Sequence, residues 1–125
     1  DDDCDWRREN DRTRGFSKEN AVKIVSAPEK NVLLQNYPNP FNPETWIPYK
    51  LSEDSDVCIK IYNLRGELVR ILELGFHWRG RYTDRENTAY WDGRNQLGER
   101  VSSGIYFYFI QADNFAATRK MIIVD

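Results

Sequence analysis

The chain has 125 residues, a formal net charge of −2, a 14% share of aromatic residues, seven Gly and five Pro. This length allows one domain of ordinary size, and the near balance of acids and bases gives no electrostatic support to a nucleic-acid or polybasic membrane role. No apolar run approaches the ~20 residues of a membrane-spanning helix, and the composition favours an all-β domain with many turns.

The first part of the chain, residues 1–30, contains eight acidic and seven basic residues and shows little apolar periodicity. Such a stretch buries too little apolar area to offset its conformational entropy. We therefore predict a charged, flexible leader or linker over residues 1–30 and one domain over residues 31–125. A calcium cluster is a weaker interpretation, because the acidic residues lack the ligand alternation and turn glycine of a calcium loop. These acidic residues are Asp1, Asp2, Asp3 and Asp5.

A proline-rich stretch opens the predicted domain and excludes a helix there, because proline fixes its own φ and restricts the residue before it. Three of the five prolines fall within six positions, at Pro38, Pro40 and Pro43. Tyr37 and Phe41 place large apolar groups in this stretch, which is therefore predicted to be a stiff lead-in packed onto the domain. Residues 46–51 alternate between two faces and predict a half-buried strand, in which Pro48 favours a sheet edge.

The middle of the chain repeats the pattern of a strand followed by a turn. Residues 57–62 alternate and predict a second strand with its apolar residues facing the core. Gly66 belongs to the turn that follows, where a glycine takes a positive φ without steric cost. A third strand is predicted over residues 68–74, and residues 75–86 are predicted to form a long polar connection.

The last part of the chain predicts the remaining strands. Residues 88–91 form a short extended segment, and a turn with two glycines follows it. Residues 105–112 are apolar on both faces, which is typical of a strand in the middle of a sheet, and Gly104 precedes them where a positive φ or a close backbone approach is expected. Residues 118–124 predict the final strand. At least six short strands, with turn signals about every 8–12 residues, predict an antiparallel β-sandwich.

The side chains that could carry chemistry do not form a catalytic pattern. His77 is the only imidazole, and no nucleophile or orienting partner stands near it in the sequence. Asp92 precedes a glycine, where an aspartate caps a turn through the backbone, and an exposed turn explains the acids of residues 53–56. We therefore predict no enzyme activity, no cofactor and no metal site. Cys4 and Cys58 could form one disulfide in an extracellular domain, but Cys4 lies in the leader and Cys58 at an outward strand position, which favours unpaired thiols.

Several of these pieces stand in an order typical of one family. They are Asn-Tyr-Pro-Asn-Pro-Phe-Asn-Pro at 36–43, Ile-Tyr-Asn-Leu-Arg-Gly at 61–66, Trp-Asp-Gly at 91–93, Gly98, Ser-Gly-Ile-Tyr at 103–106 and Lys-Met at 120–121. Over residues 33–124 the chain resembles the C-terminal sorting domain of type IX secretion cargo. The stretch from Trp-Asp-Gly to Ser-Gly-Ile-Tyr is shared with the flagellar hook-capping, FlgD-like immunoglobulin-like domain, whereas the proline-rich lead-in is more specific to sorting domains.

The resemblance implies an all-β, immunoglobulin-like antiparallel sandwich of about seven strands. It also implies a non-catalytic module that directs a larger secreted protein through the periplasm to the cell surface. The implied partners are the outer-membrane secretion and sorting machinery and an upstream cargo domain, which we expect before Asp1 because the chain does not begin with Met. The residues that the resemblance assigns to recognition are Pro38, Asn39, Pro40, Gly66, Gly104, Tyr106, Lys120 and Met121.

Two other functions remain open at the level of the sequence. The domain could be a structural or interaction module of an extracellular or periplasmic protein, without an export role of its own. It could also be a carbohydrate-binding module, although aromatic residues on a sandwich more often pack in its core or rim. The aromatic residues concerned are Trp46, Trp78, Trp91 and Tyr82.

Overall fold

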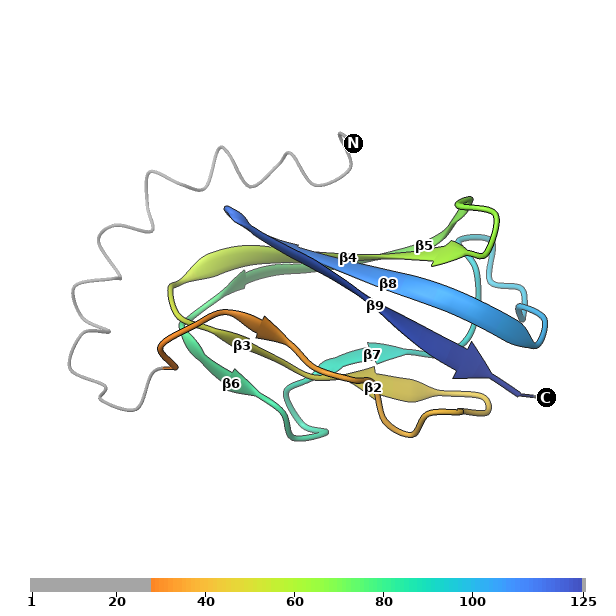
Figure 1. Ribbon diagram of the computed structural model, residues 1–125, viewed down its shortest axis with the longest axis horizontal. Coiled ribbons are helices and arrows are strands. Elements are labelled where there is room, and N and C mark those ends of the chain that lie inside the picture. The colour runs from red at the N-terminus through yellow and green to blue at the C-terminus, as the bar shows by residue number, and fades with distance from the viewer. Residues whose placement is uncertain (1–27, 125) are drawn as a thin grey trace.

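Short alternating segments, separated by turns rich in Gly, Pro and Asn, fold here into strands that each bury one face. The computed structural model describes residues 28–124, and these form nine β-strands without a helix (Figure 1). Most of the leader predicted over residues 1–30 lies outside the described residues. The strands in chain order are β1 (Val32–Leu33), β2 (Thr45–Ile47), β3 (Tyr49–Leu51), β4 (Ser55–Asn63), β5 (Leu68–His77), β6 (Gly80–Tyr82), β7 (Ala89–Trp91), β8 (Gly104–Ala112) and β9 (Phe115–Ile123).

The strands form two facing layers. One layer is a four-stranded sheet in the order β5-β4-β8-β9, and the other consists of a three-stranded sheet, β1-β3-β6, and a two-stranded sheet, β2-β7. Figure 1 shows the four-stranded sheet above the smaller sheets, and every strand pairing is antiparallel. The predicted all-β, immunoglobulin-like sandwich is thereby confirmed.

The core lies between the two layers and contains the inward positions that the sequence predicts. Ile59 of β4 and Tyr108 and Ile110 of β8 have no exposed surface. Strand β8 lies between β4 and β9, as the apolar residues on both of its faces predict. The four-stranded sheet therefore forms around β8.

The strand predicted over residues 46–51 is divided in two by Pro48. Proline has no N–H to donate to a ladder, and here its carbonyl accepts a hydrogen bond from the Leu34 N–H at 3.0 Å. The part before it, β2, pairs with β7, whereas the part after it, β3, pairs with β1 and β6. This division moves the chain from one small sheet to the other while Ile47 and Tyr49 remain fully buried.

Two expectations from the sequence are wrong in this region. Residues 75–86 are not wholly a polar connection, because β5 continues to His77 and β6 pairs with β3. Ring stacking explains the additional strand, since Tyr82 stacks on Tyr49 at 5.1 Å and on His77 at 4.9 Å. Cys58 faces outward in register but is only 3% exposed and is disulfide-bonded, not an unpaired thiol. The other cysteine, Cys4, lies outside the described residues.

Candidate recognition site

The proline-rich lead-in segment, residues 35–43, lies beside the end of β9. Phe41 forms a parallel bridge with Ile123. The Phe41 N–H donates to the Ile122 carbonyl, and the Val124 N–H donates to the Phe41 carbonyl, each at 3.0 Å. The first and last parts of the family motif are therefore joined through the backbone.

Two amide side chains of the lead-in segment extend this contact. The Asn39 Oδ1 accepts a hydrogen bond from the Ile122 N–H at 2.9 Å, across 83 positions of sequence. The Gln35 Nε2 donates to the Lys120 carbonyl at 2.8 Å. Since β9 is an edge strand, these groups would otherwise be open to solvent. The two amides thus cap the outer edge of the final strand.

Buried polar contacts hold the lead-in segment in place. The Asn36 N–H donates to the Tyr108 hydroxyl at 2.8 Å, and that hydroxyl donates to the Leu34 carbonyl at 2.7 Å. Burial raises the pKa of Tyr108 to about 12, so this hydroxyl keeps its proton at physiological pH. Asn36 is 2% exposed, and its Nδ2 also donates to the Thr45 Oγ1 at 2.9 Å. The segment is therefore fixed to the sandwich on its inner side.

The Trp-Asp-Gly and Ser-Gly-Ile-Tyr motifs support the same segment from within the core. Phe41 packs against Trp91 with ring centroids 5.7 Å apart, and Trp91 packs against Tyr106 at 6.0 Å. Gly93 lies so close to the backbone of the lead-in segment that an added Cβ would be 2.5 Å from the Pro43 carbonyl oxygen. These motifs therefore position the lead-in segment.

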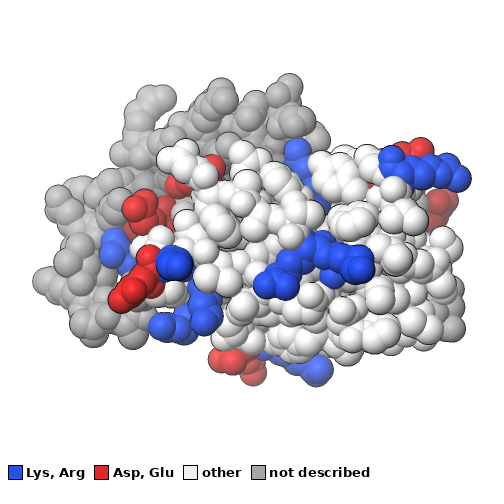
Figure 2. All heavy atoms as spheres, in the orientation of Figure 1, with Lys and Arg blue, Asp and Glu red and all other residues white. Residues whose placement is uncertain are grey.

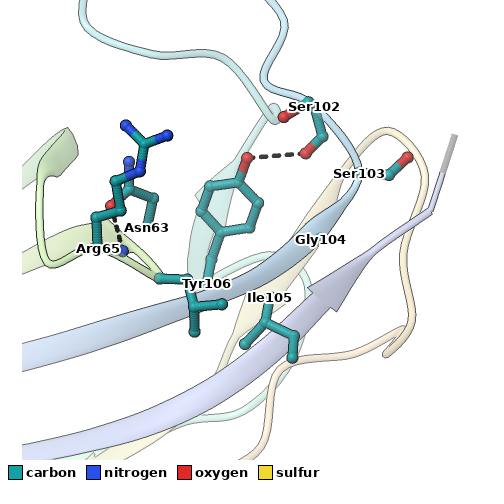
Figure 3. Close-up of a pocket in the computed structure, with 8 residues that line it drawn as sticks. Asn63, Arg65, Ser102, Ser103, Gly104, Ile105 and Tyr106 are labelled. Atoms are coloured by element: carbon teal, nitrogen blue, oxygen red, sulfur yellow. Dashed lines mark hydrogen bonds between the residues drawn. The ribbon is translucent and has the colours of Figure 1, made fainter.

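A pocket of about 350 Å³ lies between the β4–β5 turn and the start of β8 (Figure 3). Hydrogen bonds brace both walls: the Arg65 N–H donates to the Asn63 Oδ1 at 2.9 Å, and the Tyr106 hydroxyl donates to the Ser102 carbonyl at 2.8 Å. The rim includes an exposed Leu64. The structure thus brings together the turn that contains Gly66 and the residues around Gly104. The lining residues are Asn63, Leu64, Arg65, Ser102, Ser103, Gly104, Ile105 and Tyr106.

The predicted recognition residues divide into exposed and supporting positions. Lys120 is exposed, whereas Met121 is fully buried and Tyr106 is 6% exposed. The predicted residues in the lead-in segment, Pro38, Asn39 and Pro40, are all exposed. Sequence reasoning missed Gln35 and Ile122, because no local signal reveals a contact between segments so far apart in the chain.

Gly104 has a φ of 151°, and an added Cβ would meet nothing within 4 Å. A substitution there is therefore strained by the backbone and not by crowding. We expect Gly104→Val to lower the free energy of unfolding by about 1–3 kcal/mol, as measured by urea denaturation. Ser102→Val, at a nearby exposed position, is the control and should change stability by less than about 0.5 kcal/mol. If Gly104→Val is as stable as the native chain, the backbone at this position is not strained by a side chain.

The residues considered for other functions occupy structural positions. His77 stacks on Tyr82, and Asp92 binds its own turn, where its Oδ1 accepts from the Arg94 N–H at 3.0 Å. Trp91 has no exposed surface, and the Arg85 guanidinium lies 4.1 Å from the centre of the Trp46 ring. Within residues 28–124, no group of three or more His, Cys, Asp or Glu side chains could hold a metal ion. In the same range there is no helix long and apolar enough to cross a membrane.

Comparisons with solved structures find similar folds. PorU from Porphyromonas gingivalis matches 80% of this chain with 21% identity and a TM-score of 0.54. PorZ, described as an essential surface component of the type-IX secretion system of the same organism, matches 81% with 16% identity and a TM-score of 0.52. The match covers 10% of PorU and 13% of PorZ. At these identities the likeness shows the fold alone.

A weaker match connects the chain with FlgD from P. aeruginosa, with 18% identity, a TM-score of 0.48, and coverage of 77% of this chain and 67% of FlgD. A search of curated proteins finds no significant match. The family described as "Secretion system C-terminal sorting domain" matches residues 35–124, from the Gln35 cap to the end of the final strand. The chain therefore belongs to the family of secretion system C-terminal sorting domains.

Proposed function

We propose that this domain directs a larger protein through the type IX secretion system, by way of the periplasm, to the cell surface. The family match over residues 35–124 supports this function, and the contact between the lead-in segment and β9 is the observation that carries its mechanism. The domain itself acts without catalysis. Residues 1–30, predicted as a charged leader, would link it to the upstream cargo, and the outer-membrane secretion machinery would be its partner.

The signal in this proposal is a folded surface rather than a linear peptide. Asn39 and Lys120 are brought to the same edge by hydrogen bonds between the lead-in segment and β9. Pro38 and Pro40 flank Asn39 and are exposed beside it. An unfolded chain would not present this combination, so export machinery that reads it would select folded domains.

The remaining motif residues would shape or support this surface. Gly66 has a φ of 84°, which suits the tight turn beside the pocket. Gly104 and Tyr106 form the opposite wall. Met121 contributes through the core, because its side chain has no exposed surface.

A charge reversal on the exposed edge tests this proposal. The full chain is fused to an inert periplasmic reporter in a host with a type IX system, and the surface-exposed reporter is quantified. We expect Lys120→Glu to reduce the amount of surface-exposed reporter about tenfold. This is the effect of losing one charge-assisted hydrogen bond to the export machinery, worth about 1.5 kcal/mol. The stability of the domain should change by no more than about 0.5 kcal/mol, because the side chain is exposed.

Lys30→Glu is the matched control, because Lys30 is also exposed and lies outside the residues that match the family. This control should leave export unchanged. Equal export of both variants would rule out direct reading of Lys120. If the unmodified fusion stays in the periplasm while the host exports its own cargo, a structural or interaction module replaces the sorting function.

A further inference from the structure

Strand β9 is one edge of the four-stranded sheet, and only half of that edge is covered. Successive residues of a strand direct their backbone groups to opposite sides. The Ile122 N–H and carbonyl both bind the lead-in segment, and so does the Lys120 carbonyl. The even-numbered residues of β9 therefore direct their N–H and C=O groups outward. The register between β8 and β9 is continuous from Gly104↔Ile123 to Ala112↔Phe115, so this assignment extends along the whole strand.

The upstream half of the same edge is open. Ala116 and Thr118 are exposed, and within residues 28–124 no hydrogen bond reaches their outward N–H and C=O groups. Natural edge strands are commonly protected by charged side chains, prolines or bulges. Residues 115–118 contain no charge and no proline, and no bulge interrupts their pairing. This part of β9 has the features of a site that can accept another strand.

The surroundings of this open edge indicate what such a strand would carry. Figure 2 shows basic side chains over the middle of β9 with uncharged side chains around them. Lys120 is exposed at one end of the open edge and would pair with a carboxylate. On the same face, Phe109 lies opposite the small Thr118 in register and is half-buried, so an apolar side chain would pack over Thr118 towards its ring.

We propose that residues 115–120 of β9 accept an extended segment of a partner protein as an added strand. That segment would bind the outward N–H and C=O groups of Ala116 and Thr118 and the N–H of Lys120, because the Lys120 carbonyl already binds Gln35. It would also place a carboxylate beside the Lys120 side chain and an apolar side chain beside Thr118. The lead-in segment already binds the other half of the edge in this way, through Phe41. The inference rests on the proposed function, because the partner is taken to be part of the export machinery.

Hydrogen exchange of the free chain tests directly whether the upstream half of the β9 edge is open. We expect the backbone amides of Ala116 and Thr118 to exchange at least about a hundredfold faster than those of Ala117 and Arg119, which face β8. Exchange followed by NMR resolves these amides individually. Equal protection at all four positions would mean that the edge is already occupied, and the proposal would fail.

Thr118→Pro tests the role of the edge in export. Its N–H points away from β8, so proline removes no bond from the native ladder but blocks a hydrogen bond to an added strand. With the reporter fusion, we expect export to fall at least about tenfold. Thr118→Val keeps the N–H and should be exported like the native chain. Ala116→Pro is an independent second variant for the case in which Thr118→Pro unfolds, as judged by its melting curve.

The outcomes separate this inference from the proposed function. Normal export of a folded Thr118→Pro or Ala116→Pro variant overturns the added strand but leaves the sorting function intact. Failure of the native fusion to be exported overturns both. If sedimentation shows that the native chain is a dimer and that Thr118→Pro is a monomer, a second copy occupies the edge, and a strand from the export machinery does not.

Discussion

Trp91→Ala is expected to lower the free energy of unfolding by about 3–5 kcal/mol, which is the range for removal of a large ring from a well-packed core. The Trp91 side chain has no exposed surface and packs between Phe41 and Tyr106. Its Nε1 also donates to the Arg94 carbonyl at 2.9 Å, so the substitution leaves a cavity and removes this hydrogen bond. Urea denaturation with an unchanged m-value would measure the loss.

The comparison variant is Trp78→Ala, because Trp78 is 46% exposed and lies outside the core cluster. It should cost less than about 1.5 kcal/mol. If both variants lose the same free energy of unfolding, the buried Trp91 ring contributes no more to stability than the exposed Trp78 ring. Its packing against Phe41 would then not stabilise the lead-in segment.

Gly93→Ala is the second substitution with a large expected effect, about 2–4 kcal/mol. Two costs combine there: Gly93 has a φ of 78°, and an added Cβ would lie 2.5 Å from the Pro43 carbonyl oxygen. Relief of that contact would move the lead-in segment away from β9. Urea denaturation gives the stability loss, and faster exchange of the Phe41 amide would report the movement.

Gly98→Ala separates the two costs. Gly98 has a similar φ of 86°, but an added Cβ there would meet nothing within 4 Å. It should therefore show only the backbone strain, about 1 kcal/mol, and should leave the exchange of the Phe41 amide unchanged. Equal effects of the two substitutions would contradict the close contact between Gly93 and Pro43.

The strand pattern and the core could be predicted well from the sequence, because alternation depends on local burial. The alternation over residues 57–62 correctly predicted which side chains of β4 face the core, and the apolar residues on both faces of β8 correctly predicted a strand inside the sheet. The role of Pro48 was only partly predictable. Its missing N–H favours a sheet edge. The passage of the chain from one small sheet to the other, however, depends on the pairing of β2 with β7 and of β3 with β6, which a local pattern does not encode.

Contacts between distant segments could not be predicted in the same way. The hydrogen bond between Asn39 and Ile122 joins residues 83 positions apart, and no local pattern encodes it. Strand β6 was missed because its stabilising ring contacts come from Tyr49 and His77, on two other strands. The family resemblance supplied the motif residues, but the structure shows which of them are exposed, as Lys120 is, and which are buried, as Met121 is.

Protease accessibility of a fused reporter on intact cells tests the central claim most directly. The full chain is placed after an inert periplasmic reporter in a host with a type IX secretion system, and protease is added outside the cells. If the lead-in segment and β9 form a sorting signal, the reporter should be degraded in the native host and protected in a strain that lacks the secretion system. A reporter that stays protected in both strains, while the native cargo of the host reaches the surface, would contradict the sorting function of this domain.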